Sequence, residues 1–109
     1  MKPRVAFLGT PGFAAAILTV LVEAGWDIPL VITNPDRPRG RGRTLAASAV
    51  SEAARRHGLA IRKPGRDGLV GALSGLPIDA VVVASYGQLL AKAVLDLYPD
   101  RFVNVHASL

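Results

Sequence analysis

The sequence predicts an α/β fold, a doubly wound parallel sheet, on three observations. Short apolar runs recur along the chain, as in strands that are buried on both faces of a parallel sheet. Stretches with apolar residues at helical spacing separate these runs, and Gly or Pro stands at most of the junctions. Strands that alternate with helices in this way form a Rossmann-like sheet with right-handed connections.

The first strand–helix–strand unit is expected within the first 33 residues. Residues 4–9 predict a buried strand, residues 10–12 a turn, and residues 28–33 a second strand. Gly25 is expected to end the intervening helix in a left-handed conformation. The apolar positions of that helix are Phe13, Ile17, Val20, Leu21 and Ala24.

Residues 34–43 interrupt the pattern. They contain two Pro, two Gly and four Arg, so they fit neither a helix nor a central strand. We therefore predict a loop, and a loop of this length and composition indicates a functional role.

The remaining elements follow in alternation. Ser48 is expected to cap a helix that ends at His57 and Gly58, and Asp67 a shorter helix over residues 69–73. A helix is also expected over residues 89–97, and strands over residues 59–61, 78–84 and 102–106. The total is five strands and four helices, and no helix follows the last strand. We therefore expect a sheet that is truncated after its fifth strand.

Composition excludes several classes of protein. The 109 residues suit one domain or part of a larger one, and 50% hydrophobic against 19% charged residues indicates a globular chain. The absence of cysteine excludes disulfides and thiolate metal sites. The apolar run that follows the first four residues and ends before Thr10 is too short for a signal-peptide core, and no run has the length of a spanning helix. We expect a soluble cytoplasmic protein with no membrane partner and no metal.

The positive charge is concentrated in one segment. Residues 34–66 hold nine Lys or Arg against two Asp or Glu, whereas the rest of the chain holds four against six. This asymmetry indicates a polyanionic partner. The arginines at alternate positions suit phosphate contact, and the lack of aromatics argues against base stacking. They are Arg37, Arg39, Arg41 and Arg43. A merely solvated loop is the alternative.

Two residues near the carboxyl end of the last predicted strand could carry chemistry. Asn104 and His106 are two apart on a strand, so both face the same side. An amide that donates to a developing oxyanion, beside an imidazole that moves a proton, suits acyl transfer. A histidine that is only hydrogen-bonded is the alternative.

The glycines of two turns bear on the ligand. The turn after Gly9 lacks the dinucleotide fingerprint, which speaks against a nicotinamide cofactor. Gly87, directly after Tyr86, permits close approach of a flat ligand, and an ordinary loop glycine is the alternative.

Four stretches together carry a resemblance to a known family. They are residues 7–14 (Phe-Leu-Gly-Thr-Pro-Gly-Phe-Ala), 34–43, 81–90 (Val-Val-Val-Ala-Ser-Tyr-Gly-Gln-Leu-Leu) and 104–109 (Asn-Val-His-Ala-Ser-Leu). In order and spacing the chain resembles the N-terminal domain of the methionyl-tRNA formyltransferases. The first and third stretches are shared with other folate-dependent formyltransferases, and the arginine stretch is the specific one.

The resemblance implies a function and a set of roles. It implies formyl transfer from 10-formyltetrahydrofolate to the amino group of methionyl initiator tRNA in translation initiation, by an enzyme that is monomeric at full length. Asn104 would stabilise the oxyanion and His106 would move a proton, with a third catalytic residue, an aspartate, beyond Leu109. The implied folate contacts are Tyr86, Gly87, Gln88, Leu89, Ser108 and Leu109, and the implied tRNA contacts are Arg37, Arg39, Arg41 and Arg43.

The resemblance also implies that residues 1–109 are the N-terminal part of a catalytic domain, inactive without the rest of that domain and a C-terminal tRNA-binding domain. Two alternatives remain. A sugar-nucleotide formyltransferase shares the chemistry, but the arginine stretch speaks against it. A non-catalytic module that binds nucleic acid or folate would be separated from both enzymes by a formyl-transfer assay.

Overall fold

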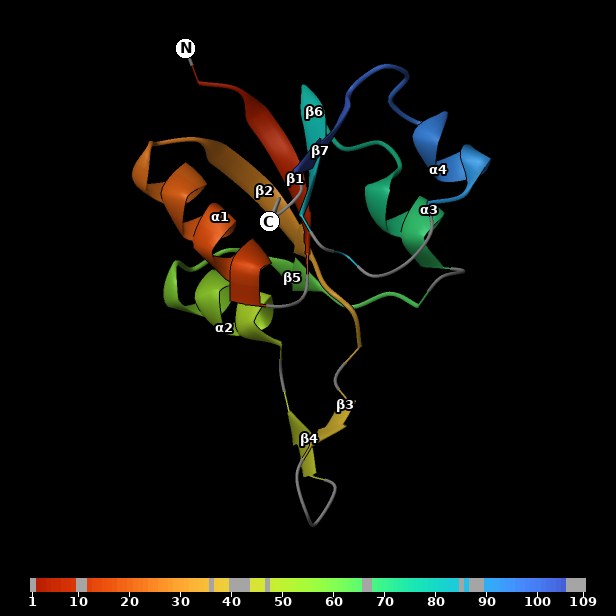
Figure 1. Ribbon diagram of the computed structural model, residues 1–109. Coiled ribbons are helices and arrows are strands. Elements are labelled where there is room, and N and C mark those ends of the chain that lie inside the picture. The colour runs from red at the N-terminus through yellow and green to blue at the C-terminus, as the bar shows by residue number, and fades with distance from the viewer. Residues whose placement is uncertain are drawn as a thin grey trace.

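A computed structural model describes most of the chain. The described residues are 2–9, 12–35, 37–39, 44–46, 48–65, 68–84, 86 and 90–105, with the backbone alone for 37–39 and 44–46. Within them, five strands form one parallel sheet in the order β5-β2-β1-β6-β7 (Figure 1). These strands are β1 (Arg4–Gly9), β2 (Asp27–Ile32), β5 (Ile61–Arg62), β6 (Ala80–Ala84) and β7 (Phe102–Val105). The chain winds outward from β1 in both directions, which confirms the predicted doubly wound sheet.

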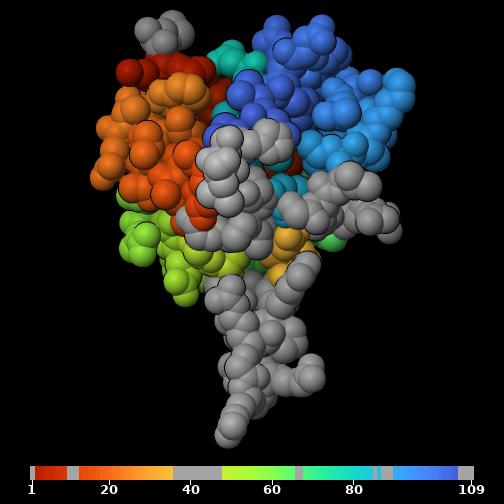
Figure 2. Space-filling model, in the orientation of Figure 1, coloured from red at the N-terminus to blue at the C-terminus, as the bar shows by residue number. Residues whose placement is uncertain are grey.

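Helices cover both faces of this sheet. They are α1 (Gly12–Glu23), α2 (Ala49–Arg56), α3 (Leu69–Leu73) and α4 (Lys92–Leu95). Helices α1 and α2 lie on one side of the sheet and α3 and α4 on the other (Figure 1). In the space-filling view α1 and α2 form the left flank and α4 the right (Figure 2).

Alternation along β1 divides the core into two layers. Val5 and Phe7 pack with residues of α1 and α2, whereas Ala6 and Leu8 pack with residues of α3 and α4. All four are almost completely buried, as expected for a central parallel strand. The continuous apolar run in the sequence therefore serves two separate cores.

Helix α1 is correctly predicted as an element, and its buried face is predicted in part, since Phe13, Ile17 and Leu21 pack against the core. Val20, one of the predicted apolar positions, is 60% exposed, whereas Ala14 and Leu18 are completely buried. The helix is apolar almost throughout, so spacing alone could not single out the side that packs on the sheet. Gly25, with φ of +86°, ends the helix in the predicted left-handed conformation.

Several other predicted boundaries shift, among them those of β2, which is Asp27–Ile32 rather than residues 28–33. Strand β5 is Ile61–Arg62 rather than residues 59–61, although the Ala60 carbonyl still accepts from the Val31 N–H of β2 at 2.9 Å. Strand β6 begins at Ala80 rather than residue 78. Helix α4 begins at Lys92 rather than residue 89, because the backbone at Ala91 is still extended, with ψ of 157°.

The predicted loop over residues 34–43 is wrong in part. Strands β3 (Arg37–Arg39) and β4 (Thr44–Ala46) pair antiparallel, with Pro38 opposite Leu45. Among the described strands these two pair only with each other, so the expectation that no central strand forms here is correct. Figure 1 shows this β3–β4 hairpin standing out from the carboxyl ends of the sheet strands.

The pairing of β3 with β4 could not be predicted from the sequence, for a physical reason. Arg-Pro-Arg has little intrinsic strand preference, and a two-stranded ribbon is recognised from a turn signal rather than from apolar alternation. None of the helices in the described part of the chain combines the length and apolarity that a membrane span requires.

Candidate functional site

The strand register brings the candidate residues to the carboxyl edge of the sheet. Leu8 pairs with both Ile32 and Val83, and Val83 pairs with Asn104. Gly9, at the end of β1, pairs with the last residue of β6. Ligands of open α/β sheets bind at this edge, so Asn104 lies in the expected place.

Asn104 is exposed and lies on a defined face of the sheet. It alternates with Val103 and Val105 and therefore shares the face of Phe102, which packs against the α3–α4 core. Its amide is thus accessible from the α3–α4 side of the sheet. The predicted partner His106 lies outside the described residues, so their juxtaposition stays a prediction.

Tyr86 supports the end of β6 from inside. Its side chain is 2% exposed and belongs to the core that α3 and α4 cover. Burial raises the pKa of the Tyr86 phenol above its ordinary value of 10, so the ring is neutral at physiological pH. The other predicted folate contacts, namely Gly87, Gln88, Leu89, Ser108 and Leu109, lie outside the described residues.

Gly9 allows three elements to converge at the edge. A Cβ atom at this position would lie 2.6 Å from the Cβ of Ala14 in α1 and 2.7 Å from the carbonyl oxygen of Ala84 in β6. It would also lie 3.1 Å from Cε1 of Phe7. Only a residue without a side chain lets β1, β6 and α1 approach this closely.

Two buried hydrogen bonds between side chains and distant residues lie at the same edge. The Asn34 Nδ2 amide donates to the Tyr86 carbonyl at 2.8 Å. The hydroxyls of Thr33 and Ser48 share a hydrogen bond of 2.8 Å, and Ser48 Oγ also accepts from the Ser51 backbone N–H at 3.0 Å. The hydrogen bond from the Ser51 backbone N–H confirms Ser48 as the predicted cap of α2.

The sequence did not predict a role for Thr33, and it predicted Asn34 only as part of the loop. A signal was present, because both are polar residues directly after the apolar run of β2, at the edge where ligands bind. Their partners, 15 and 52 residues away, could not be identified without the fold.

The hairpin holds the arginine positions that the structure describes. Arg37 and Arg39 are the first and last residues of β3. Arg41 and Arg43 lie outside the described residues. Two of the four predicted arginine positions therefore belong to the projecting ribbon.

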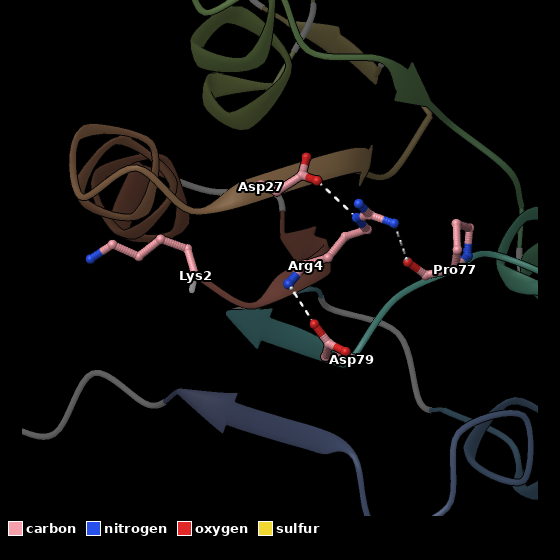
Figure 3. Close-up of a pocket in the computed structure, with 5 residues that line it drawn as sticks. All are labelled: Lys2, Arg4, Asp27, Pro77 and Asp79. Carbon is pink, nitrogen blue, oxygen red and sulfur yellow. Dashed lines mark hydrogen bonds and ion pairs between the residues drawn. The ribbon is translucent and has the colours of Figure 1, made fainter.

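The opposite edge of the sheet has a hollow of about 400 Å³ lined by Lys2, Arg4, Asp27, Pro77 and Asp79 (Figure 3). Arg4 fills its centre. Arg4 Nε donates to Asp27 Oδ2 at 2.8 Å and Nη1 to the Pro77 carbonyl at 3.3 Å, while the Arg4 backbone N–H donates to Asp79 Oδ2 at 2.9 Å. Arg4 is paired with Asp27, both side chains are about half exposed, and Lys2 points away from the two carboxylates (Figure 3), so this cluster ties the strand starts together and is not a ligand site.

Metal ligands are not assembled in the described part of the chain. No three His, Cys, Asp or Glu residues there lie close enough to hold an ion.

Comparison with known proteins identifies the family. A family model described as formyl transferase matches residues 3–109. The chain belongs to the formyl transferase family.

Curated relatives refine this position within the family. The chain is 47% identical over 117 residues to the methionyl-tRNA formyltransferase of Paraburkholderia phymatum, and 52% identical over 109 residues to that of Thiobacillus denitrificans. Each match covers 97% of this chain but only 36% and 35% of the relative. The chain thus spans about a third of the length of these relatives, and the resemblance to their N-terminal part is confirmed.

Solved structures of the formyl transferase fold agree with the architecture. Glycinamide ribonucleotide transformylase 1 from Symbiobacterium toebii matches with a TM-score of 0.71 at 24% identity, over 99% of this chain and 53% of that chain. The corresponding protein from Geobacillus kaustophilus matches with a TM-score of 0.71 at 20% identity, over 100% and 60%. At these identities the likeness establishes the fold alone.

Proposed function

We propose that this chain is the N-terminal part of the catalytic domain of a cytoplasmic methionyl-tRNA formyltransferase. In the complete protein it would transfer the formyl group of 10-formyltetrahydrofolate to the amino group of methionyl initiator tRNA. The observation that carries this proposal is the identity of 47–52% to methionyl-tRNA formyltransferases over 97% of the chain.

The geometry of the sheet edge supports an acyl-transfer role for Asn104. When the amino group attacks the formyl carbon, the carbonyl oxygen gains negative charge, and an accessible amide N–H at this edge can donate to it. The bond from the formyl carbon to N10 of the folate then breaks. The amine loses one proton and N10 gains one, a transfer that we assign to His106.

The arginine-bearing hairpin supports a nucleic-acid acceptor. A ribbon that projects from the same edge can reach the sugar–phosphate backbone next to the reacting amino group, and arginine binds phosphate through paired N–H donors. We assign phosphate contact to Arg37, Arg39, Arg41 and Arg43, and the folate site to the β6 end and residues 108–109.

The first experiment tests the catalytic residue. Formyl transfer to methionyl-tRNA is measured with the complete gene product and with Asn104→Ala, and we expect kcat to fall by roughly 100-fold to 1,000-fold, as for loss of one oxyanion donor. The control is Val103→Ala, since Val103 is an exposed neighbour on the opposite face of β7. Unchanged kcat in Asn104→Ala would remove Asn104 from the mechanism.

The second experiment tests the acceptor. Arg41→Ala should raise the KM for methionyl-tRNA and leave the KM for the folate unchanged, because a lost phosphate contact affects only the acceptor. Arg101→Ala is the matched control, because Arg101 precedes β7 at the opposite edge of the sheet. Equal effects of the two substitutions would argue against the hairpin as the tRNA contact.

A further inference from the structure

We propose that Asn34 is a positioning residue, which fixes the β3–β4 hairpin on the end of β6 so that a bound acceptor meets the carboxyl edge of the sheet. The Thr33–Ser48 hydroxyl pair assists by joining the entry of the hairpin to its exit. The role in orienting the acceptor rests on the proposed function, whereas the mechanical role of Asn34 does not.

The hairpin depends on its roots for its orientation. Among the described strands, β3 and β4 pair only with each other and make no ladder with the five-stranded sheet. A two-stranded ribbon of three residues a strand gains little stability from its own pairing. Its direction relative to the sheet is therefore set by the residues that lead into and out of it.

The entry root is held by a bond to a different strand. Asn34 follows β2 by two residues and is 5% exposed, and its Nδ2 donates to the Tyr86 carbonyl at 2.8 Å. Tyr86 in turn is held by its buried ring and by the adjoining strand β6. Since Tyr86 has these independent supports, the bond constrains the hairpin more than it constrains Tyr86.

The exit root is joined to the entry root. Thr33, whose backbone N–H donates to the Arg62 carbonyl at 3.1 Å, is completely buried and bonds Ser48 through its hydroxyl. Ser48 is the N-cap of α2. Both roots are thus locked in a water-excluded layer, where a hydrogen bond restrains geometry more strongly than it does at the surface.

The mechanical part is tested by a distance measurement. Residues 1–109 contain no cysteine, so spin labels on Glu23→Cys, at the exposed end of α1, and Leu45→Cys, in β4, are unique within them. Any cysteine elsewhere in the complete gene product is first replaced by serine. Asn34→Leu keeps the approximate shape but cannot donate, so we expect the interspin distance distribution to broaden relative to the parent.

The catalytic part is tested by kinetics on the same variant without labels. We expect kcat/KM for methionyl-tRNA to fall about tenfold, as for a buried hydrogen bond lost with one partner left unpaired. With methionyl-tRNA saturating, kcat/KM for the folate should stay at the parental value. Loss of folded enzyme would lower kcat/KM for both substrates by the same factor and change neither KM, so an effect confined to the acceptor separates positioning from folding.

A second pair of variants covers the case in which Asn34→Leu fails to fold. Thr33→Val removes the hydroxyl that bonds Ser48, whereas Thr33→Ser keeps it. We expect broadening and slower acceptor use in Thr33→Val and recovery of both in Thr33→Ser.

The outcomes are distinguishable. An unchanged distance distribution in Asn34→Leu overturns the proposal, whatever the activity. A broadened distribution with unchanged acceptor kinetics overturns the positioning role and leaves formyl transfer standing. If the parent transfers no formyl group, the proposed function fails, and the distance measurement alone supports or overturns the mechanical role.

Discussion

Gly9→Ala should destabilise the fold strongly, because three elements meet at this position. The added Cβ would lie 2.6 Å from the Ala14 Cβ and 2.7 Å from the Ala84 carbonyl oxygen. Neither atom can swing aside, since one is the first side-chain carbon of a helix residue and the other belongs to the backbone of the neighbouring strand. The strand and the helix would have to separate.

The size of the effect follows from these distances. Carbon atoms in ordinary contact lie about 3.5 Å apart, whereas the new Cβ would lie 2.6 Å from the Ala14 Cβ, so α1 must move away from β1 by about 0.9 Å. Overpacking of this kind costs typically 1–3 kcal/mol, and two immovable neighbours place Gly9→Ala at about 3 kcal/mol. That is a large fraction of the roughly 5–15 kcal/mol by which domains are stable.

Urea denaturation of the parent and the variant measures this cost. With a denaturant dependence of about 1.5 kcal/mol per molar, the midpoint should fall by about 2 M. Gly71→Ala is the matched control, since Gly71 lies within α3 and an added Cβ meets nothing within 4 Å. The same substitution there should raise the free energy of unfolding by up to about 1 kcal/mol.

A double variant isolates the contact with the helix. In the Ala14→Gly background Gly9→Ala should cost about 1 kcal/mol less, because one of the two clashes is gone. A Gly9→Ala protein as stable as the parent would refute the reasoning. So would equal costs in the two backgrounds.

Three further substitutions, with Ser51→Ala as a control for the first, have expected outcomes that chemical denaturation can check. Ser48→Ala should lower the free energy of unfolding by about 1–2 kcal/mol through loss of the α2 cap, and Ser51→Ala should not, since its buried hydroxyl has no hydrogen-bond partner among the described residues. Tyr98→Phe should cost about 1–2 kcal/mol, because its hydroxyl donates to the Leu73 carbonyl at 2.6 Å and accepts from the Leu76 N–H at 3.0 Å. Tyr86→Phe should be compared with the parent over a pH series. Burial raises the pKa of Tyr86 above 10, so above pH 10 the unfolded chain loses the phenolic proton before the folded chain does. The free energy of unfolding of the parent should therefore fall faster with pH than that of Tyr86→Phe above pH 10. Below pH 10 the difference in free energy between the two proteins should not change with pH.

The layered fold could be predicted because its signals are local. The apolar runs of β1 and β6 and the cap of α2 at Ser48 each depend on residues that are adjacent in the chain. The buried face of α1 could be predicted only in part, because an almost wholly apolar helix offers several faces and only the sheet selects one. Ile17 and Leu21 pack against the core as predicted, whereas Val20 is exposed.

In the candidate site, too, the features with a local signal in the sequence could be predicted and those that depend on tertiary contacts could not. Asn104 could be placed at the carboxyl edge from strand alternation and the rule for parallel sheets. The Asn34–Tyr86 bond could not be predicted, because its partners are 52 residues apart and either residue has many possible partners. A backbone carbonyl as acceptor leaves no pattern in the sequence at all.

The β3–β4 hairpin combines features that are local in the sequence with features that depend on long-range contacts. Its arginines can be recognised from composition, and its pairing is local, but neither fixes where the ribbon points. Paired N–H donors orient a phosphate relative to an arginine, but group transfer also requires that arginine to be held in place relative to the sheet, so that the reacting amine reaches one carbon atom. The buried bonds of Asn34 and Thr33, two uncharged residues at the root of the hairpin, supply that orientation. The polar residues that flank a charged loop therefore deserve mutation alongside the charges, because they decide whether binding leads to reaction.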